Sequence, residues 1–118
     1  MYALRSIGAE NQVEVLLDGG VRRGSDIFKA IALGAKGVGI GRPILYGLSA
    51  YGEAGVSKVV DMLKDELENT MENAGTPSIS DIHERYVDIR SLRDHSHPPT
   101  DSLGDAVYEP LRLLSSRL

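Results

Sequence analysis

Apolar residues gather into short blocks along the chain, and their spacing differs from block to block. Residues 13–17 are apolar or β-branched except for Glu14, and they run into Asp-Gly-Gly at 18–20, which predicts a strand ending in a turn. Residues 37–41 alternate glycine with valine and isoleucine and predict a second strand. Strands without a polar face are typical of a parallel sheet covered by helices, so we expect both to be buried.

Between the two strands the apolar spacing changes to three and four residues, which predicts a helix over residues 26–33. Ser25 is a favourable N-cap for this helix, and Gly34 is a typical residue to close it. After the second strand, Pro43 suits the first turn of a short helix over residues 43–51.

The longest predicted helix covers residues 53–74 and ends at Gly75 and Pro77. Its apolar positions form one stripe, made of Val56, Val59, Val60, Leu63, Leu67, Met71 and Ala74. Residues 78–83 are expected to add one helical turn. The remaining residues, 84–118, are polar, contain prolines and show little periodicity, so we interpret them as an extended tail.

The predicted order of strand, helix, strand, short helix and long helix is typical of a parallel βα architecture, so the fold class is α/β. Two strands cannot close a barrel, which needs eight strands and about 250 residues. We therefore expect either that further sequence completes the fold or that its strands present unpaired edges.

Composition excludes several classes of function. The 118-residue chain has no cysteine, which rules out disulfides and thiolate metal sites, and its net charge of −4 argues against a nucleic-acid surface. The most apolar stretch, residues 27–48, contains three charged residues, so we expect no membrane span. The start of the chain lacks the apolar core of a signal peptide.

Two glycine-rich loops follow the two predicted strands, at residues 18–24 and 39–43. Glycines there let backbone N–H groups approach a ligand, and the helix that starts at Pro43 offers its N-terminus to an anion. Arg22, Arg23 and Arg42 add positive charge. The loops therefore predict a phosphate site, although tight turns beside surface arginines are the alternative. A dinucleotide site is excluded because the Gly-x-Gly-x-x-Gly motif would need its last glycine at position 42 or 44, where this chain has Arg and Ile.

Four motifs resemble the FMN-dependent α-hydroxy-acid oxidase and dehydrogenase family, which includes glycolate oxidase and flavocytochrome-type L-lactate dehydrogenase. They are Leu-Leu-Asp-Gly-Gly-Val-Arg-Arg-Gly-Ser-Asp (16–26), Lys-Ala-Ile-Ala-Leu-Gly-Ala-Lys (29–36), Gly-Ile-Gly-Arg-Pro (39–43) and Tyr-Gly-Glu-Ala-Gly-Val (51–56). The resemblance implies the last two βα units of a (β/α)8 TIM barrel with a C-terminal helix. Residues 1–83 would form this part, and residues 84–118 the tail. Residues 105–110 are more weakly similar to the end of flavocytochrome-type lactate dehydrogenases.

The resemblance also implies FMN as cofactor and a role for each loop. Asp18 is similar to the residue that binds the ribityl chain, and Arg22 to a partner of the phosphate or the ribityl chain. Arg23 is equally well explained as a solvated or ion-paired surface residue. The complete set of cofactor-binding positions implied is Asp18, Gly19, Gly20, Val21, Arg22, Gly41 and Arg42.

The substrate chemistry of the family is missing from these motifs. Its catalytic histidine lies in a His-Gly-Gly-Arg type motif upstream of the Asp-Gly-Gly loop, whereas residues 1–17 contain no histidine. His83, His95 and His97 do not replace it, and a metal site at His95-x-His97 is not expected. We therefore expect the flavin-phosphate part of an oxidoreductase that oxidises 2-hydroxy acids such as L-lactate, inactive alone.

Two alternatives remain at this stage. One is another FMN or phosphate barrel, against which the motif at 51–56 argues. The other is a non-catalytic FMN- or phosphate-binding or subunit-docking remnant. A complete enzyme would be a homo-oligomer that takes FMN and a small 2-hydroxy acid, in a cytoplasmic or mitochondrial compartment that the sequence does not decide.

We predict that the isolated chain is marginally stable and self-associates, because its strands and helix stripe have apolar faces that a chain of this length does not cover. Size-exclusion chromatography is expected to show aggregates or oligomers. A soluble monomer that unfolds cooperatively by circular dichroism would contradict the prediction.

Overall fold

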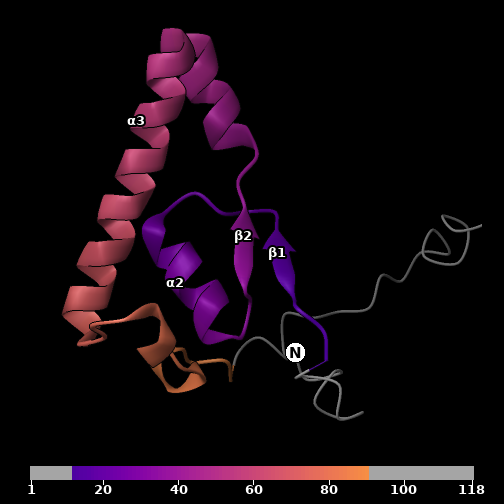
Figure 1. Ribbon diagram of the computed structural model, residues 1–118, viewed down its shortest axis with the longest axis vertical. Coiled ribbons are helices and arrows are strands. Elements are labelled where there is room, and N and C mark those ends of the chain that lie inside the picture. The colour runs from indigo at the N-terminus through magenta and orange to yellow at the C-terminus, as the bar shows by residue number, and fades with distance from the viewer. Residues whose placement is uncertain (1–11, 91–118) are drawn as a thin grey trace, which may run out of the picture. The chain divides into compact units, whose positions relative to one another are not determined.

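The computed structural model of the protein describes residues 12–90, in which strands and helices alternate (Figure 1). The elements, in chain order, are β1 (Leu16–Asp18), α2 (Gly24–Ala32), β2 (Gly37–Gly39), α3 (Arg42–Ala74) and the 3-10 helices η1 (Ile79–Asp81) and η2 (Glu84–Tyr86). This order confirms the predicted α/β class. None of these helices is long and apolar enough to cross a membrane.

Strands β1 and β2 form a two-stranded parallel sheet, with Leu16 opposite Gly37 and Asp18 opposite Gly39. One further bond, from the Lys36 N–H to the Val15 carbonyl at 2.8 Å, extends the pairing toward the start of β1. The prediction that residues 13–17 are buried is wrong, since Leu16 is 74% exposed. Within residues 12–90, β1 has β2 as its one neighbouring strand, and no helix packs closely against it.

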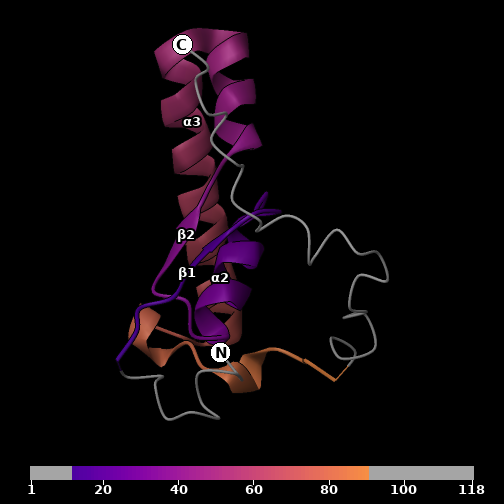
Figure 2. The same ribbon diagram turned by 90° about the vertical axis from the view of Figure 1, so that its right-hand side faces the viewer.

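Helix α2 packs against the long arm of α3 and also contacts β2 and η2 (Figures 1 and 2). It begins one residue before Ser25, and the N-cap is Arg23, so the prediction of Ser25 as the cap is wrong. The reason is that the carboxylate of Asp26, further along the first turn, accepts the backbone N–H groups at the helix start. Gly34 has a φ of 98°, and it ends the helix as expected.

Helix α3 folds back on itself at Tyr51 and Gly52, whose backbone angles are not helical (Figure 1). The two predicted helices, 43–51 and 53–74, are thus confirmed as two arms. Gly52 has a φ of 61°, which glycine adopts without strain. The arms meet at Gly47 and Gly55, where a Cβ on Gly47 would lie 2.7 Å from the Gly55 carbonyl oxygen. Small residues at this crossing therefore let the two arms approach closely.

The hydrophobic core lies beside α2, where Phe28, Ala32 and Ile82 are buried. Tyr86 packs edge-on against Phe28, with ring centroids 5.9 Å apart. Partly buried apolar residues from α2, α3 and the following turns complete this cluster: Ile31, Leu67, Met71, Ala74, Tyr86 and Val87. Leu67, Met71 and Ala74 of the predicted stripe therefore pack against this core, whereas Val59 lies beside Gly47 of the short arm and Val60 is 50% exposed.

The predicted start of the tail at residue 84 requires correction. Residues 84–86 form η2, and Tyr86 and Val87 contact the core, so the compact unit ends at Val87. The aromatic ring of Tyr86 packs against Phe28 and so belongs to the compact unit. The sequence did not predict that Tyr86 and Val87 contact the core, because the few apolar residues in this segment follow neither a helical nor a strand period.

We predict that Gly55→Ala destabilises the protein, because the added Cβ would collide with the Gly47 carbonyl group. Overpacking of this kind costs about 1–3 kcal/mol. Urea unfolding followed by circular dichroism measures the effect, and Ser57→Ala, at an exposed position of the same helix, is the control. Equal stability of the Gly55→Ala and Ser57→Ala variants would show that the two arms are not in close contact.

Candidate functional site

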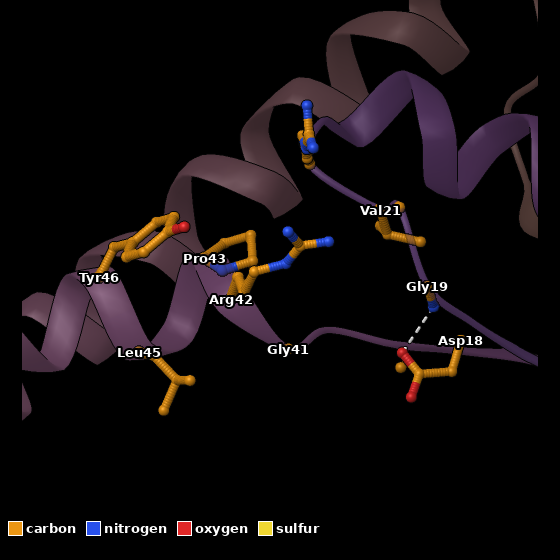
Figure 3. Close-up of a pocket in the computed structure, with 11 residues that line it drawn as sticks. Asp18, Gly19, Val21, Gly41, Arg42, Pro43, Leu45 and Tyr46 are labelled. Carbon is orange, nitrogen blue, oxygen red and sulfur yellow. Dashed lines mark hydrogen bonds between the residues drawn. The ribbon is translucent and has the colours of Figure 1, made fainter.

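A pocket of about 760 Å³ lies at the carboxyl ends of β1 and β2 (Figure 3). The loop after β1 forms one side of the pocket, and the start of α3 forms the other. Its lining residues are Asp18, Gly19, Gly20, Val21, Arg22, Gly39, Gly41, Arg42, Pro43, Leu45 and Tyr46. The volume is within the usual range for sites that bind a small molecule or cofactor.

The loop after β1 has an unusual backbone. Gly19 and Gly20 both have positive φ, 99° and 76°, which residues with a side chain rarely adopt. The Gly19 N–H donates to the Asp18 carboxylate at 2.7 Å (Figure 3), while the buried side chain of Val21 fixes the far end of the loop. The glycine backbone therefore lines the pocket at a position where no Cβ narrows it.

Helix α3 presents its N-terminus to the same pocket. Gly41 is the N-cap, and Pro43 lies in a first turn that contains no acidic residue. Figure 3 shows the Arg42 side chain reaching from the start of α3 toward the loop that carries Gly19 and Val21. The open end of the helix dipole and this guanidinium together favour an anion.

Two of the three arginines in the loops are available to a ligand. Among the residues that the structure describes, the side chains of Arg22 and Arg42 have no carboxylate partner. Arg23 instead pairs with Glu66, with 3.3 Å between its Nη1 atom and Oε1 of the carboxylate. Arg23 is absent from the pocket lining, so the ion-paired surface interpretation of this residue is confirmed.

The N-terminus of α2, in contrast, is already closed by protein carboxylates. The N–H groups of Arg22 and Arg23 donate to Asp26 Oδ2 at 3.1 and 3.0 Å. The N–H of Gly24 donates to Glu66 Oε2 at 2.8 Å. Because these donors are occupied, the N-terminus that remains open to an anion at this pocket is that of α3.

All seven positions expected to bind the cofactor line this one pocket. The lining also includes Leu45 and the 67% exposed Tyr46, which were not among the cofactor-binding positions that the sequence implied. One signal was present, since Tyr46 is one helical turn beyond Arg42 and therefore lies on the same face. Nothing in the sequence singles out Glu66, because its partner Gly24 lies 42 positions away along the chain.

His83, the one histidine among the described residues, does not line the pocket. His83 is exposed and lies beside Tyr86, with 6.4 Å between ring centroids. His95 and His97 lie outside the described residues. Within residues 12–90, no group of three or more acidic, histidine or cysteine side chains is arranged to hold a metal ion.

Comparison with known proteins decides the family. Residues 1–89 match the model of the FMN-dependent dehydrogenase family. The chain belongs to this family. The chain is 60% identical, over 72% of its length, to a peroxisomal (S)-2-hydroxyacid oxidase of Arabidopsis thaliana, of which it covers 23%. It is 44% identical, over 92% of its length, to the L-lactate dehydrogenase (cytochrome) of Wickerhamomyces anomalus, of which it covers 18%.

Solved structures show the same relationship. A mutant flavocytochrome b2 with pyruvate bound matches 96% of the chain at 43% identity and a TM-score of 0.76, while the chain covers 29% of that structure. An (S)-mandelate dehydrogenase described as a monotopic membrane protein matches 71% of the chain at 44% identity and a TM-score of 0.65, and 22% of it is covered. The chain thus spans about a fifth of the length of the two curated relatives.

The donor set of the pocket fits FMN, the cofactor of this family. A phosphate dianion requires several N–H donors and positive charge, which the glycine loop, the start of α3, Arg22 and Arg42 place around one cavity. The ribityl chain carries hydroxyl groups, for which the exposed carboxylate of Asp18 is a suitable acceptor. The described part of the chain therefore has groups for the phosphate and ribityl ends of the cofactor.

We predict that Asp26→Ala lowers the stability of the protein by about 1 kcal/mol, the usual cost of losing a helix cap. The two backbone N–H groups of Arg22 and Arg23 would lose their common acceptor. Chemical unfolding measures the difference, and Asp61→Ala, an exposed residue of α3, is the control. A loss no larger than that of the control would contradict a capping role.

Proposed function

We propose that this chain binds the phosphate and ribityl end of FMN, and that the complete protein oxidises a 2-hydroxy acid such as L-lactate to the 2-oxo acid. The observation that carries the proposal is the open N-terminus of α3, which has no acid in its first turn and directs Arg42 into the pocket. FMN, when bound, supplies the acceptor for the hydride from the substrate carbon. The names of the relatives support this class of reaction.

Each side of the pocket has a separate task in this proposal. Arg42 and the backbone at Gly41 hold the phosphate from the α3 side, through a guanidinium and a helix N-terminus. Gly19, Gly20 and Val21 bring the β1 loop close to the phosphate, and Arg22 neutralises its second charge. Asp18 accepts a hydroxyl of the ribityl chain through the carboxylate oxygen Oδ2, because Oδ1 already accepts the Gly19 N–H.

The chain binds and orients in this proposal, and it does not carry out proton transfer. The residues that line the pocket include no histidine, and residues 1–17 contain none. A general base for the substrate hydroxyl must lie within hydrogen-bond reach of it. We therefore propose that the chain alone is inactive and that the proton acceptor and the substrate carboxylate clamp belong to other parts of the complete enzyme.

We predict that the chain binds FMN more tightly than riboflavin, which differs from FMN in lacking the phosphate. Flavin fluorescence titration gives both dissociation constants. The dissociation constant for riboflavin divided by that for FMN measures the contribution of the phosphate to binding. Arg42→Ala is expected to lower this ratio about tenfold, because it removes a charge-assisted hydrogen bond. Arg23→Ala, which changes an arginine outside the pocket, is expected to leave the ratio nearly unchanged.

Equal affinity of the wild-type chain for FMN and riboflavin would overturn the phosphate site. Adding L-lactate or glycolate to the FMN-loaded chain without oxygen tests the second part of the proposal. The flavin absorbance is expected to persist, and bleaching would show that this chain does contain a working catalytic base.

A further inference from the structure

Glu66 connects two parts of the protein that are distant in sequence. It lies on the long arm of α3, half-buried, and its two carboxylate oxygens contact the start of α2. Oε2 accepts the backbone N–H of Gly24 at 2.8 Å, and Oε1 lies 3.3 Å from Arg23 Nη1. One side chain therefore holds the end of the loop whose other residues, from Asp18 to Arg22, line the pocket.

The surroundings of Gly24 leave this loop little freedom. A Cβ on Gly24 would collide with the backbone of α3 at Glu66 and Leu67, so the two backbones are in direct contact. At its other end the loop continues from β1, which is held by β2. The loop is thus fixed at both ends, and Glu66 provides the polar contact at the α2 end.

The negative charge of Glu66 determines where an anion can bind. An open start of α2 and an unpaired Arg23 would compete with the α3 side for an anion. The carboxylate of Glu66 occupies the Gly24 N–H and pairs with Arg23, and it is absent from the pocket lining. Glu66 therefore removes a competing anion site without adding negative charge to the wall of the pocket.

From this geometry we infer that Glu66 is a positioning residue for the phosphate of the cofactor, and the inference rests on the proposed function. Glu66 holds the loop so that Gly19, Gly20 and Arg22 face the same anion as Arg42. It touches neither cofactor nor substrate and acts through the loop. The hydrogen bond to Gly24 is the essential contact, because the ion pair with Arg23 is exposed and such pairs contribute little.

The test compares three variants of the full 118-residue chain by the ratio of the dissociation constants for riboflavin and FMN. Glu66→Ala removes the acceptor for Gly24 and is expected to lower the ratio about tenfold, the contribution of one charge-assisted hydrogen bond from the loop to the phosphate. Glu66→Gln keeps an oxygen acceptor without the charge and is expected to restore most of the ratio. Glu68→Ala, which removes an exposed acid that pairs with Lys64, is the control.

A role in stability alone would lower the melting temperature of Glu66→Ala and leave the ratio unchanged, and that result would overturn the inference. A tighter FMN complex in Glu66→Ala would also overturn it, because the carboxylate would then act mainly by repelling the phosphate. Failure of Glu66→Gln to restore the ratio would contradict the assignment of the Gly24 contact as essential.

Amide hydrogen exchange separates this inference from the proposed function, since it requires no flavin. Peptides that cover residues 19–24 are expected to exchange faster in Glu66→Ala than in the wild-type or Glu68→Ala chains. If the wild-type chain does not distinguish FMN from riboflavin, the proposed function fails. If it does distinguish them and exchange in the loop is unchanged by Glu66→Ala, the positioning role fails.

Discussion

The close contact between the start of α2 and the long arm of α3 determines the arrangement of the other elements. Gly24 leaves no space for a side chain against the α3 backbone, and the Glu66 carboxylate accepts its N–H. Phe28 and Ala32 then face the same arm one and two turns further along and form the core with Ile82. The contact also positions the loop before α2, so the core and the pocket depend on the same junction.

The two helix N-termini near the sheet differ in their partners. The start of α2 is bonded to carboxylates, whereas the start of α3 is free of acidic residues and faces the pocket. Asp26 and Glu66 accept the N–H groups at the start of α2, as acidic groups at helix N-termini commonly do. The start of α3 has Pro43 and Arg42 and no acid. An anionic ligand in the pocket can therefore approach the start of α3 without displacing a carboxylate.

Membership of the FMN-dependent dehydrogenase family agrees with an anion site in this pocket, and it adds the identity of the cofactor. Glycine loops and arginines identify an anion as the ligand, whereas FMN as the particular cofactor comes from the family. The exposed faces of β1 are understandable in the same way. Within residues 12–90, β1 has one neighbouring strand and no closely packed helix, whereas a strand in a barrel has neighbours on both edges and faces a packed interior.

The sequence by itself determined the local elements of this protein and the positions that surround its pocket. The spacing of apolar residues, Gly34, Gly75 and Pro43 located the helices within a few residues, because periodicity and capping act over one or two turns. The two glycine loops came together because consecutive parallel strands end at the same edge of a sheet.

Only the tertiary structure decided which charges are free to bind a ligand. Arg22 and Arg23 are adjacent and chemically identical, yet Arg23 pairs with Glu66 on a helix more than 40 residues away. The same holds for the packing of Tyr86 against Phe28 and for the N-cap, which is Arg23, bonded to Asp26, in place of Ser25. Such contacts depend on how the helices pack, and packing joins residues whose separation along the chain follows no period.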